Sequence, residues 1–172
     1  MANLEILIDR AAIAARVAEL GQQISAEYAG RELLVVGVLT GAFIFTADLV
    51  RVLDLPFEVD FIRVASYGGT TSSSGQIRLS KDLESPVAGR HLLLVEDIVD
   101  TGRTLAWLQA HLLARQPASL KVCTLIDKRE RREMEVAVDY AGFPVAEGFL
   151  VGYGLDYGGH HRQLPDICRL RQ

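Results

Sequence analysis

The stretch from Leu92 to Leu105, LLLVEDIVDTGRTL, decides the fold expected for this chain. Its first four residues are apolar, as at the end of a buried strand, and from Leu105 onward apolar residues recur with the period of a helix. Residues 96–104 are therefore predicted to cross from a strand to a helix. Three carboxylates, those of Glu96, Asp97 and Asp100, lie at the carboxyl end of this strand, where open parallel sheets bind their ligands.

The two halves of the crossing suit different chemical groups. The acidic half suits the hydroxyls of a polyol or a metal ion. The second half, Thr101 to Thr104, offers hydroxyls and backbone N–H groups at the start of a helix, which suits a phosphate. The alternative interpretation is a solvated acidic turn followed by an ordinary helix cap.

The segment VEDIVDTG, residues 95–102, resembles the phosphoribosyl diphosphate signature of the type I phosphoribosyltransferases, and it is most similar to the hypoxanthine-guanine branch of that family. The resemblance implies that Glu96 and Asp97 hold the ribose hydroxyls and belong to a Mg²⁺ site. It places Asp100 near N7 of a purine base, as the catalytic group that manages a proton. The remaining predicted contacts of phosphoribosyl diphosphate in this segment are Ile98, Val99, Thr101, Gly102, Arg103 and Thr104.

Two other segments resemble the parts of the family that contact the diphosphate. Leu39, Thr40 and Gly41 follow a predicted buried strand and match the family's short diphosphate-binding loop, in which a cis peptide bond is typical. The family often has Lys at the middle position, so Thr40 departs from its pattern. Arg162 matches a diphosphate-contacting Arg, although Gln163 replaces the more usual Asp.

The resemblance also predicts the residues that contact the base. Lys128, at the end of a predicted strand, would donate to the 6-oxo group of a purine, which favours a 6-oxo over a 6-amino base. In the segment FLVGYGLDY, Phe149 would stack on the base and Leu150 would contact it through its backbone. Asp156 would support Mg²⁺ through water. The charged residues that follow Lys128, residues 129–133, are predicted to be solvated surface.

A polar, glycine-rich segment begins at Ser66 and Tyr67 and ends at Gly75. By composition alone it is equally a hairpin tip without a function. It resembles the family's flexible lid, about residues 67–75, which closes over the reacting centre and excludes water.

The alternation of predicted strands and helices indicates an α/β fold, and the resemblance implies the type I phosphoribosyltransferase fold. We expect a mostly parallel central sheet flanked by helices, with a small hood from the C-terminal and N-terminal segments, largely residues 143–172. A helix is predicted to begin after Asp9, a candidate N-cap. Apolar and polar residues alternate over residues 57–66, so Phe57, Val59 and Phe61 are predicted to lie on one side of a strand and Asp60 on the other. A length of 172 residues predicts a single domain, 1–172.

Composition excludes several classes of function. The net charge is −4 and the pI is about 5.6, which argues against a protein that coats nucleic acid. Cys123 and Cys168 have no CxxC spacing, so neither zinc nor a disulfide framework is indicated. Neither GxGxxG nor GxxxxGK[ST] occurs. No signal peptide or membrane span is evident, and we expect a cytoplasmic protein without a membrane partner.

The predicted function is purine salvage by transfer of the 5-phosphoribosyl group from phosphoribosyl diphosphate to N9 of hypoxanthine, and also of guanine, to give IMP or GMP and diphosphate. The expected partners are phosphoribosyl diphosphate, a 6-oxopurine base and Mg²⁺, without nucleic acid, in a homodimer or homotetramer. Two alternatives stay open at this point. One is a xanthine-preferring enzyme of the same fold, and the other is a non-catalytic regulator of nucleic acid that binds phosphoribosyl diphosphate.

Overall fold

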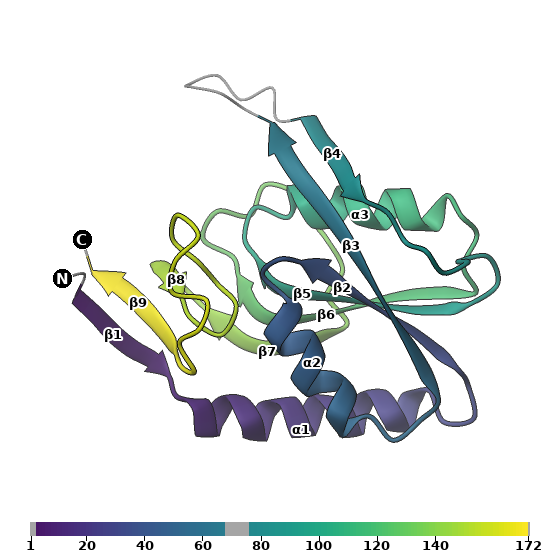
Figure 1. Ribbon diagram of the computed structural model, residues 1–172, viewed down its shortest axis with the longest axis horizontal. Helices are drawn as coiled ribbons and strands as arrows, with labels where there is room; N and C mark the ends of the chain where they lie inside the picture. The colour runs from purple at the N-terminus through teal and green to yellow at the C-terminus, as the bar shows by residue number, and fades with distance from the viewer. Residues whose placement is uncertain (1–2, 68–75, 172) are drawn as a thin grey trace.

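The computed structural model of the chain describes residues 3–67 and 76–171 and joins a six-stranded sheet to a three-stranded hood (Figure 1). In chain order its elements are β1 (Asn3–Ile8), α1 (Arg10–Glu27), β2 (Leu33–Leu39), α2 (Phe43–Val52), β3 (Phe57–Tyr67), β4 (Gln76–Lys81), β5 (His91–Val99), α3 (Arg103–Leu113), β6 (Ser119–Lys128), β7 (Tyr140–Val145), β8 (Phe149–Val151) and β9 (Ile167–Arg171).

The large sheet has the strand order β4-β3-β2-β5-β6-β7. Neighbouring strands in the run β3-β2-β5-β6-β7 all pair parallel, whereas the edge strand β4 pairs antiparallel with β3. Because β2, β5 and β6 are parallel neighbours, the loops that follow them leave from the same edge of the sheet. The predicted α/β fold with a mostly parallel sheet is confirmed.

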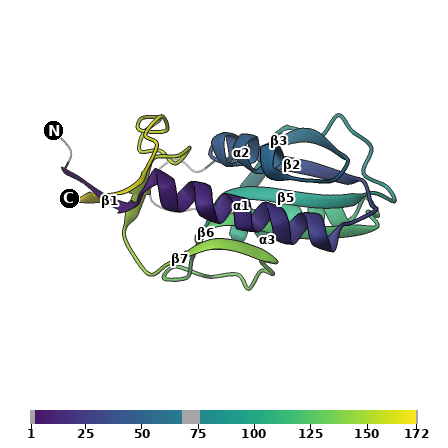
Figure 2. The same ribbon diagram turned by 90° about the horizontal axis from the view of Figure 1, so that it is seen from below.

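Helices cover both faces of this sheet, as its apolar central strands require. In β2, Leu33 and Val35 pack in one core cluster with buried residues of α1 and α2, such as Ile13 and Phe45. Leu34 and Val36 pack on the opposite face with α3 residues such as Leu105. Figure 2 shows α1 running from the hood along the sheet.

The hood is a second sheet with the strand order β1-β9-β8, in which both pairings are antiparallel. It brings the two ends of the chain side by side (Figure 1). The expected hood is confirmed. The sequence patterns did not predict its N-terminal strand, β1. Among the described residues no helix is long and apolar enough to cross a membrane.

The predicted sidedness of residues 57–66 is wrong. Asp60 and Ile62 are buried, whereas Val59 is exposed. The reason is that the connection after β4 folds against β3: the backbone N–H groups of Glu84 and Ser85 both donate to Asp60 Oδ2 at 2.8 Å. A carboxylate can be buried when several N–H groups donate to it. The polarity of Asp60 was therefore not a sign that its side chain is exposed.

Candidate active site

The loop after β5 forms a small cavity at the start of α3. The cavity has a volume of about 120 Å³. Gly102 makes the turn with a φ of 83°, and a Cβ added there would lie 2.5 Å from the carbonyl oxygen of Met134. α3 begins at the next residue, and its first N–H groups lack helical acceptors, which suits an anion. The lining residues are Glu96, Ile98, Val99, Asp100, Thr101, Gly102, Thr104 and Leu105.

Arg103, the first residue of α3, does not line the cavity. Its guanidinium forms an ion pair with Glu133 at 2.5 Å. Any contact between Arg103 and a phosphate in this cavity would therefore come from its backbone N–H group.

A second cavity, of about 260 Å³, lies where the loops after β2 and β5 meet. Leu39, Gly41, Glu96, Asp97 and Thr104 are among its lining residues. The Leu39–Thr40 peptide bond is cis, as is typical of the family's diphosphate loop. A Cβ on Gly41 would lie 1.8 Å from Asp97 Oδ2, so the loop approaches this carboxylate as closely as a glycine permits. The exposed Thr40 side chain is not part of the lining.

The carboxylates of Glu96 and Asp97 are both withdrawn from water. Burial raises the pKa of Glu96 well above its usual value, and the neighbouring charge of Asp97 raises it further. Burial also raises the pKa of Asp97, although hydrogen bonds to its carboxylate oppose the shift. A buried and a half-buried acid, both with raised pKa values, form a site that a cation would stabilise.

The two acids fit Mg²⁺ as a partial ligand set. Mg²⁺ prefers oxygen ligands and is commonly held by one or two carboxylates together with substrate oxygens. Within residues 3–67 and 76–171, no group of three or more Asp, Glu, His or Cys side chains is arranged to hold a metal ion. Glu96, Asp97 and Asp156 thus do not form one ligand cluster by themselves, and their assignment to a metal stays a prediction.

A third cavity, of about 230 Å³, brings together the residues predicted to contact a base. Lys128 is only 7% exposed, whereas Phe149 is 46% exposed and packs edge-on against Tyr157, with 5.4 Å between ring centroids. An exposed aromatic ring and a buried lysine that line the same cavity suit a flat, polar ring. The lining residues are Asp97, Ile98, Asp100, Lys128, Arg131, Gly148, Phe149, Leu150, Leu155 and Asp156.

The two oxygens of Asp100 have different surroundings. Oδ2 lies 3.5 Å from Nη1 of Arg131. Oδ1 is buried, and no described residue forms a hydrogen bond with it. A buried carboxylate oxygen without a donor is costly, so Oδ1 is suited to accept a proton or a hydrogen bond from a ligand.

The hood contributes Asp156 and Arg162 as an ion pair at 2.8 Å. Arg162 also donates to the carbonyl of Gly154 at 2.6 Å, and Asp156 accepts from the N–H of Gly159 at 2.7 Å. The hood meets the diphosphate loop directly, since a Cβ on Gly154 would lie 2.1 Å from the carbonyl oxygen of Gly41. Asp97, whose carboxylate feels the charge of Arg162, links the second and third cavities.

The prediction that residues 129–133 are solvated surface is wrong for Arg132, whose side chain is 10% exposed. Its guanidinium donates to the carbonyls of Val99, Asp100 and Lys128 and to the carboxylate of Asp127. Periodicity does not reveal this role, because the acceptors at Val99 and Asp100 lie more than thirty residues earlier in the chain.

The predicted lid lies mostly outside the described residues, which stop at Tyr67 and resume at Gln76. Ser66 and Tyr67 end β3, where they pair with Ile77 and Gln76 of β4. Ile77 lines the second cavity, so the two strands lead to the site.

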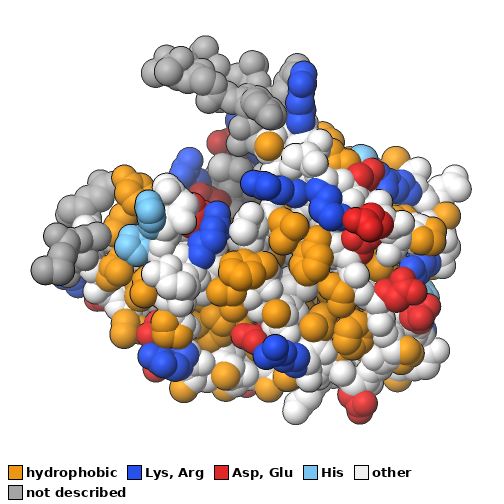
Figure 3. Space-filling view, viewed as in Figure 1, with side chains coloured by type: hydrophobic (Ala, Val, Ile, Leu, Met, Phe, Trp, Pro, Cys, Tyr) orange, Lys and Arg blue, Asp and Glu red, His pale blue; other side chains and the backbone are white. Residues whose placement is uncertain are grey.

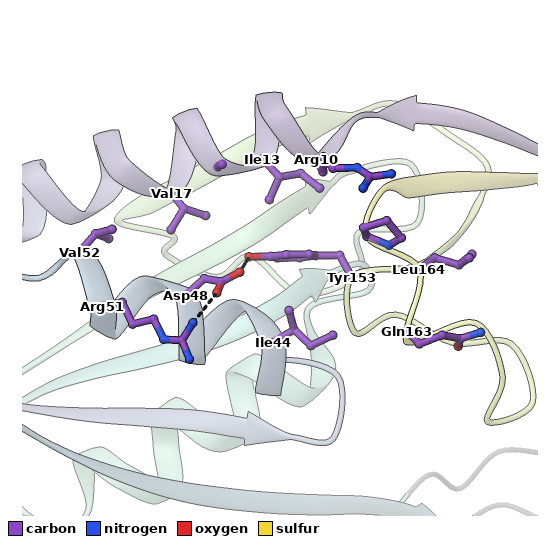
Figure 4. A pocket seen from close by; sticks show the side chains of 12 residues that line it. Arg10, Ile13, Val17, Ile44, Asp48, Arg51, Val52, Tyr153, Gln163 and Leu164 are labelled. Carbon is purple, nitrogen blue, oxygen red and sulfur yellow. Dashed lines mark hydrogen bonds and ion pairs between the residues drawn. The ribbon is translucent and has the colours of Figure 1, made fainter.

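Another cavity, of about 520 Å³, lies apart from these carboxylates, between α1, α2 and the hood (Figure 4). Its lining is mostly apolar and includes Ile13, Val17 and Ile44. On its inner side the hydroxyl of Tyr153 donates to Asp48 at 2.5 Å, which ties the hood to α2. On the side of the molecule seen in Figure 1, hydrophobic side chains gather over the lower middle of the surface (Figure 3).

Comparison with known proteins gives consistent results over nearly the whole chain. A family model described as "Phosphoribosyl transferase domain" matches residues 4–158. The hypoxanthine phosphoribosyltransferase of Salmonella typhimurium is 45% identical over 170 residues, which cover 98% of this chain and 96% of that protein. The hypoxanthine-guanine phosphoribosyltransferase of Mycobacterium avium is 46% identical, with 96% of this chain and 84% of that protein covered.

Solved structures agree with the sequence relatives. A hypoxanthine-guanine phosphoribosyltransferase from Bacillus anthracis superposes with a TM-score of 0.93 at 38% identity, covering 99% of this chain and all of that one. Its fold is therefore shared from end to end.

Proposed function

The chain belongs to the phosphoribosyltransferase family, and we propose that it transfers the 5-phosphoribosyl group of phosphoribosyl diphosphate to N9 of hypoxanthine and of guanine, in purine salvage. The observation that carries the choice of base is the buried Lys128 ammonium, which shares the third cavity with Asp100 and Phe149. A fixed cationic donor favours a 6-oxo purine, because a 6-amino group would present donors to it.

In this proposal each cavity holds one part of the substrates. The 5-phosphate occupies the cavity at the start of α3, where backbone N–H groups and the hydroxyls of Thr101 and Thr104 receive it. The ribose hydroxyls face Glu96 and Asp97 in the second cavity. Arg162, on the hood side of Asp97, binds the diphosphate.

The reaction forms the bond from N9 to C1 of the ribose and breaks the bond from C1 to the diphosphate oxygen, whose electrons leave with diphosphate. Positive charge grows on the ribose ring, beside the carboxylates of Glu96 and Asp97. The proton on N7 of the base passes to Asp100, whose Oδ1 is buried and has no described donor. Mg²⁺, when bound with the substrate oxygens and these carboxylates, supplies charge for the leaving diphosphate.

The test is a spectrophotometric assay of the purified protein with phosphoribosyl diphosphate and Mg²⁺, offering hypoxanthine, guanine, xanthine and adenine separately. We expect turnover of hypoxanthine and guanine, with adenine inert. Reactions without phosphoribosyl diphosphate are the control. Turnover of xanthine alone would replace this assignment by the xanthine-preferring one.

We also propose a homodimer or homotetramer in the cytoplasm. Support for an oligomer comes from α2, whose Phe43 and Val52 are large apolar side chains exposed to solvent; Val52 also lines the apolar cavity of Figure 4. Support for the compartment comes from Cys123 and Cys168, which are both free thiols. Sedimentation equilibrium measures the first, and fractionation of cells measures the second.

A further inference from the structure

The segment after Lys128 folds back onto the loop that follows β5, and we call residues 129–134 the clasp. The backbone N–H groups of Glu133 and Met134 both donate to the carbonyl of Thr101, at 2.9 and 3.0 Å. Arg103 of α3 pairs with Glu133. The clasp thus joins the loop after β6 to the loop after β5.

The centre of this junction is the guanidinium of Arg132. Its Nε donates to the carbonyl of Asp100 at 3.0 Å, and its Nη2 donates to Lys128 at 3.1 Å and Val99 at 3.3 Å. The same Nη2 lies 2.6 Å from Oδ1 of Asp127. Burial alone would raise the pKa of Asp127, but hydrogen bonds from Arg132 and Arg129 lower it below its usual value.

Two of these acceptors belong to the residues assigned to the base. Asp100 and Lys128 come from different strand ends, and their backbone carbonyls accept hydrogen bonds from one planar group. A guanidinium is rigid and presents its donors in a fixed fork, whereas an ammonium is a single point charge that cannot span separate acceptors in the same way.

We propose that Arg132 is a positioning residue, which fixes the proton-handling Asp100 and the base-binding Lys128 relative to each other. The proposal rests on the proposed function of the cavity they share. Arg132 does not line that cavity, so it acts through its two neighbours. A displacement of about 1 Å at a reacting group can lower the rate roughly a hundredfold. Accurate positioning of Asp100 and Lys128 by Arg132 should therefore have a large effect on kcat.

The chain offers a matched control at Arg129. Its Nε also donates to Asp127, at 3.1 Å, but its side chain is 78% exposed. No hydrogen bond joins its side chain to the loop after β5 within the described part of the chain. Arg129→Lys and Arg132→Lys therefore both alter a partner of Asp127, and only the second alters the junction.

The experiment measures steady-state kinetics with hypoxanthine and thermal unfolding for the wild type and both variants. We expect Arg132→Lys to lower kcat by about 10- to 100-fold, and Arg129→Lys to stay within about twofold of the wild type. The KM for phosphoribosyl diphosphate should change less than about threefold in Arg132→Lys, because Glu133 and Met134 still hold Thr101.

A double variant tests whether Arg132 acts through Asp100. In an Asp100→Asn background, adding Arg132→Lys should lower kcat by less than about threefold, because the group it positions is already disabled. Equal losses in both backgrounds would overturn the proposal, as would equal kinetics of Arg129→Lys and Arg132→Lys.

Asp127→Asn covers the case in which Arg132→Lys does not fold. It removes the ion pair and leaves Arg132 its three backbone acceptors, so we expect kcat within about threefold of the wild type. A loss of tenfold or more would assign the effect to the ion pair and overturn the proposal. A wild-type protein inactive with hypoxanthine would instead refute the proposed function, so the two failures are distinguishable.

Discussion

At the scale of single residues, the strongest prediction concerns Asp100. Asp100→Asn keeps the shape of the side chain but removes its capacity to take a proton, so kcat with hypoxanthine should fall by about 10²- to 10⁴-fold. The KM values should change far less, because the phosphate and ribose contacts remain. Steady-state kinetics measures both. Asp82→Asn, at a residue paired with Arg115 away from the cavities, is the control, and equal turnover in Asp100→Asn would remove Asp100 from the proton transfer.

Lys128 and Lys121 provide a second comparison, because both lie on β6. Lys128 lines the base cavity, whereas Lys121 pairs with Glu27 near the other end of the strand. Lys128→Ala should raise the KM for hypoxanthine by about tenfold or more, since a charge-assisted hydrogen bond contributes about 1.5–3 kcal/mol. It should also narrow the preference for hypoxanthine over adenine. Lys121→Ala should leave both properties unchanged, and unaltered selectivity in Lys128→Ala would exclude Lys128 from base recognition.

Glu96 links the site to the stability of the ligand-free protein. Because burial and the charge of Asp97 raise its pKa in the folded state, the stabilising contribution of protonated Glu96 is present at low pH and is lost as pH rises through the folded-state pKa. Glu96→Gln should therefore be more stable than the wild type near neutral pH, by about 0.5–2 kcal/mol, with a gap that shrinks toward pH 4.5.

Thermal unfolding of ligand-free protein at a series of pH values measures this gap, and assays at neutral pH should show reduced activity of the same variant. Glu19→Gln, at an exposed residue of α1, is the control for loss of a carboxylate. A Glu96→Gln variant that is less stable than the wild type at neutral pH would show that the buried carboxylate stabilises the fold.

At the scale of elements, the side chain of Tyr153 attaches the hood to α2. Tyr153 donates to Asp48 of α2, and its backbone N–H donates to the carbonyl of Leu164 within the hood. Tyr153→Phe removes only the first contact and should destabilise the protein by about 1–2 kcal/mol, since a hydrogen bond to a charged group is lost. For a chain of this length that is roughly a 2–8 °C fall in Tm, measured by calorimetry. An unchanged Tm would show that water replaces the Tyr153 hydroxyl as the donor to Asp48.

The elements also show what the sequence could predict. The crossing at residues 96–104 was predictable because strand, loop and helix are contiguous in the sequence. Its residues therefore lie close together without help from tertiary contacts. The roles of Arg132 and Asp60 were not, because each is set by backbone groups of a distant segment: Val99 and Asp100 for the first, Glu84 and Ser85 for the second. Neither the charged residues 129–133 nor the alternation of residues 57–66 indicates which distant backbone groups these side chains will contact.

At the scale of the whole molecule, the site is assembled from segments that are distant in the sequence and meet at one edge of the sheet. The loops after β2, β5 and β6 leave one edge of the sheet, and the hood closes over that edge through the approach of Gly154 to Gly41. β1 and β9 close the hood by pairing the two ends of the chain (Figure 1). Substrate that contacts both the sheet edge and the hood should therefore stabilise the molecule as a unit.

Binding of phosphoribosyl diphosphate with Mg²⁺ should raise the Tm of the protein. A ligand at a hundred times its Kd stabilises the folded state by about 2.7 kcal/mol, which corresponds to roughly 5–11 °C for a chain of this length. Thermal shift measurements with phosphoribosyl diphosphate, with and without Mg²⁺, test this. EDTA should remove most of the shift, because the buried Glu96 and half-buried Asp97 carboxylates then face the substrate oxygens without a cation between them. A full shift in EDTA would mean that phosphoribosyl diphosphate binds without metal, and that these two acids contact only the ribose.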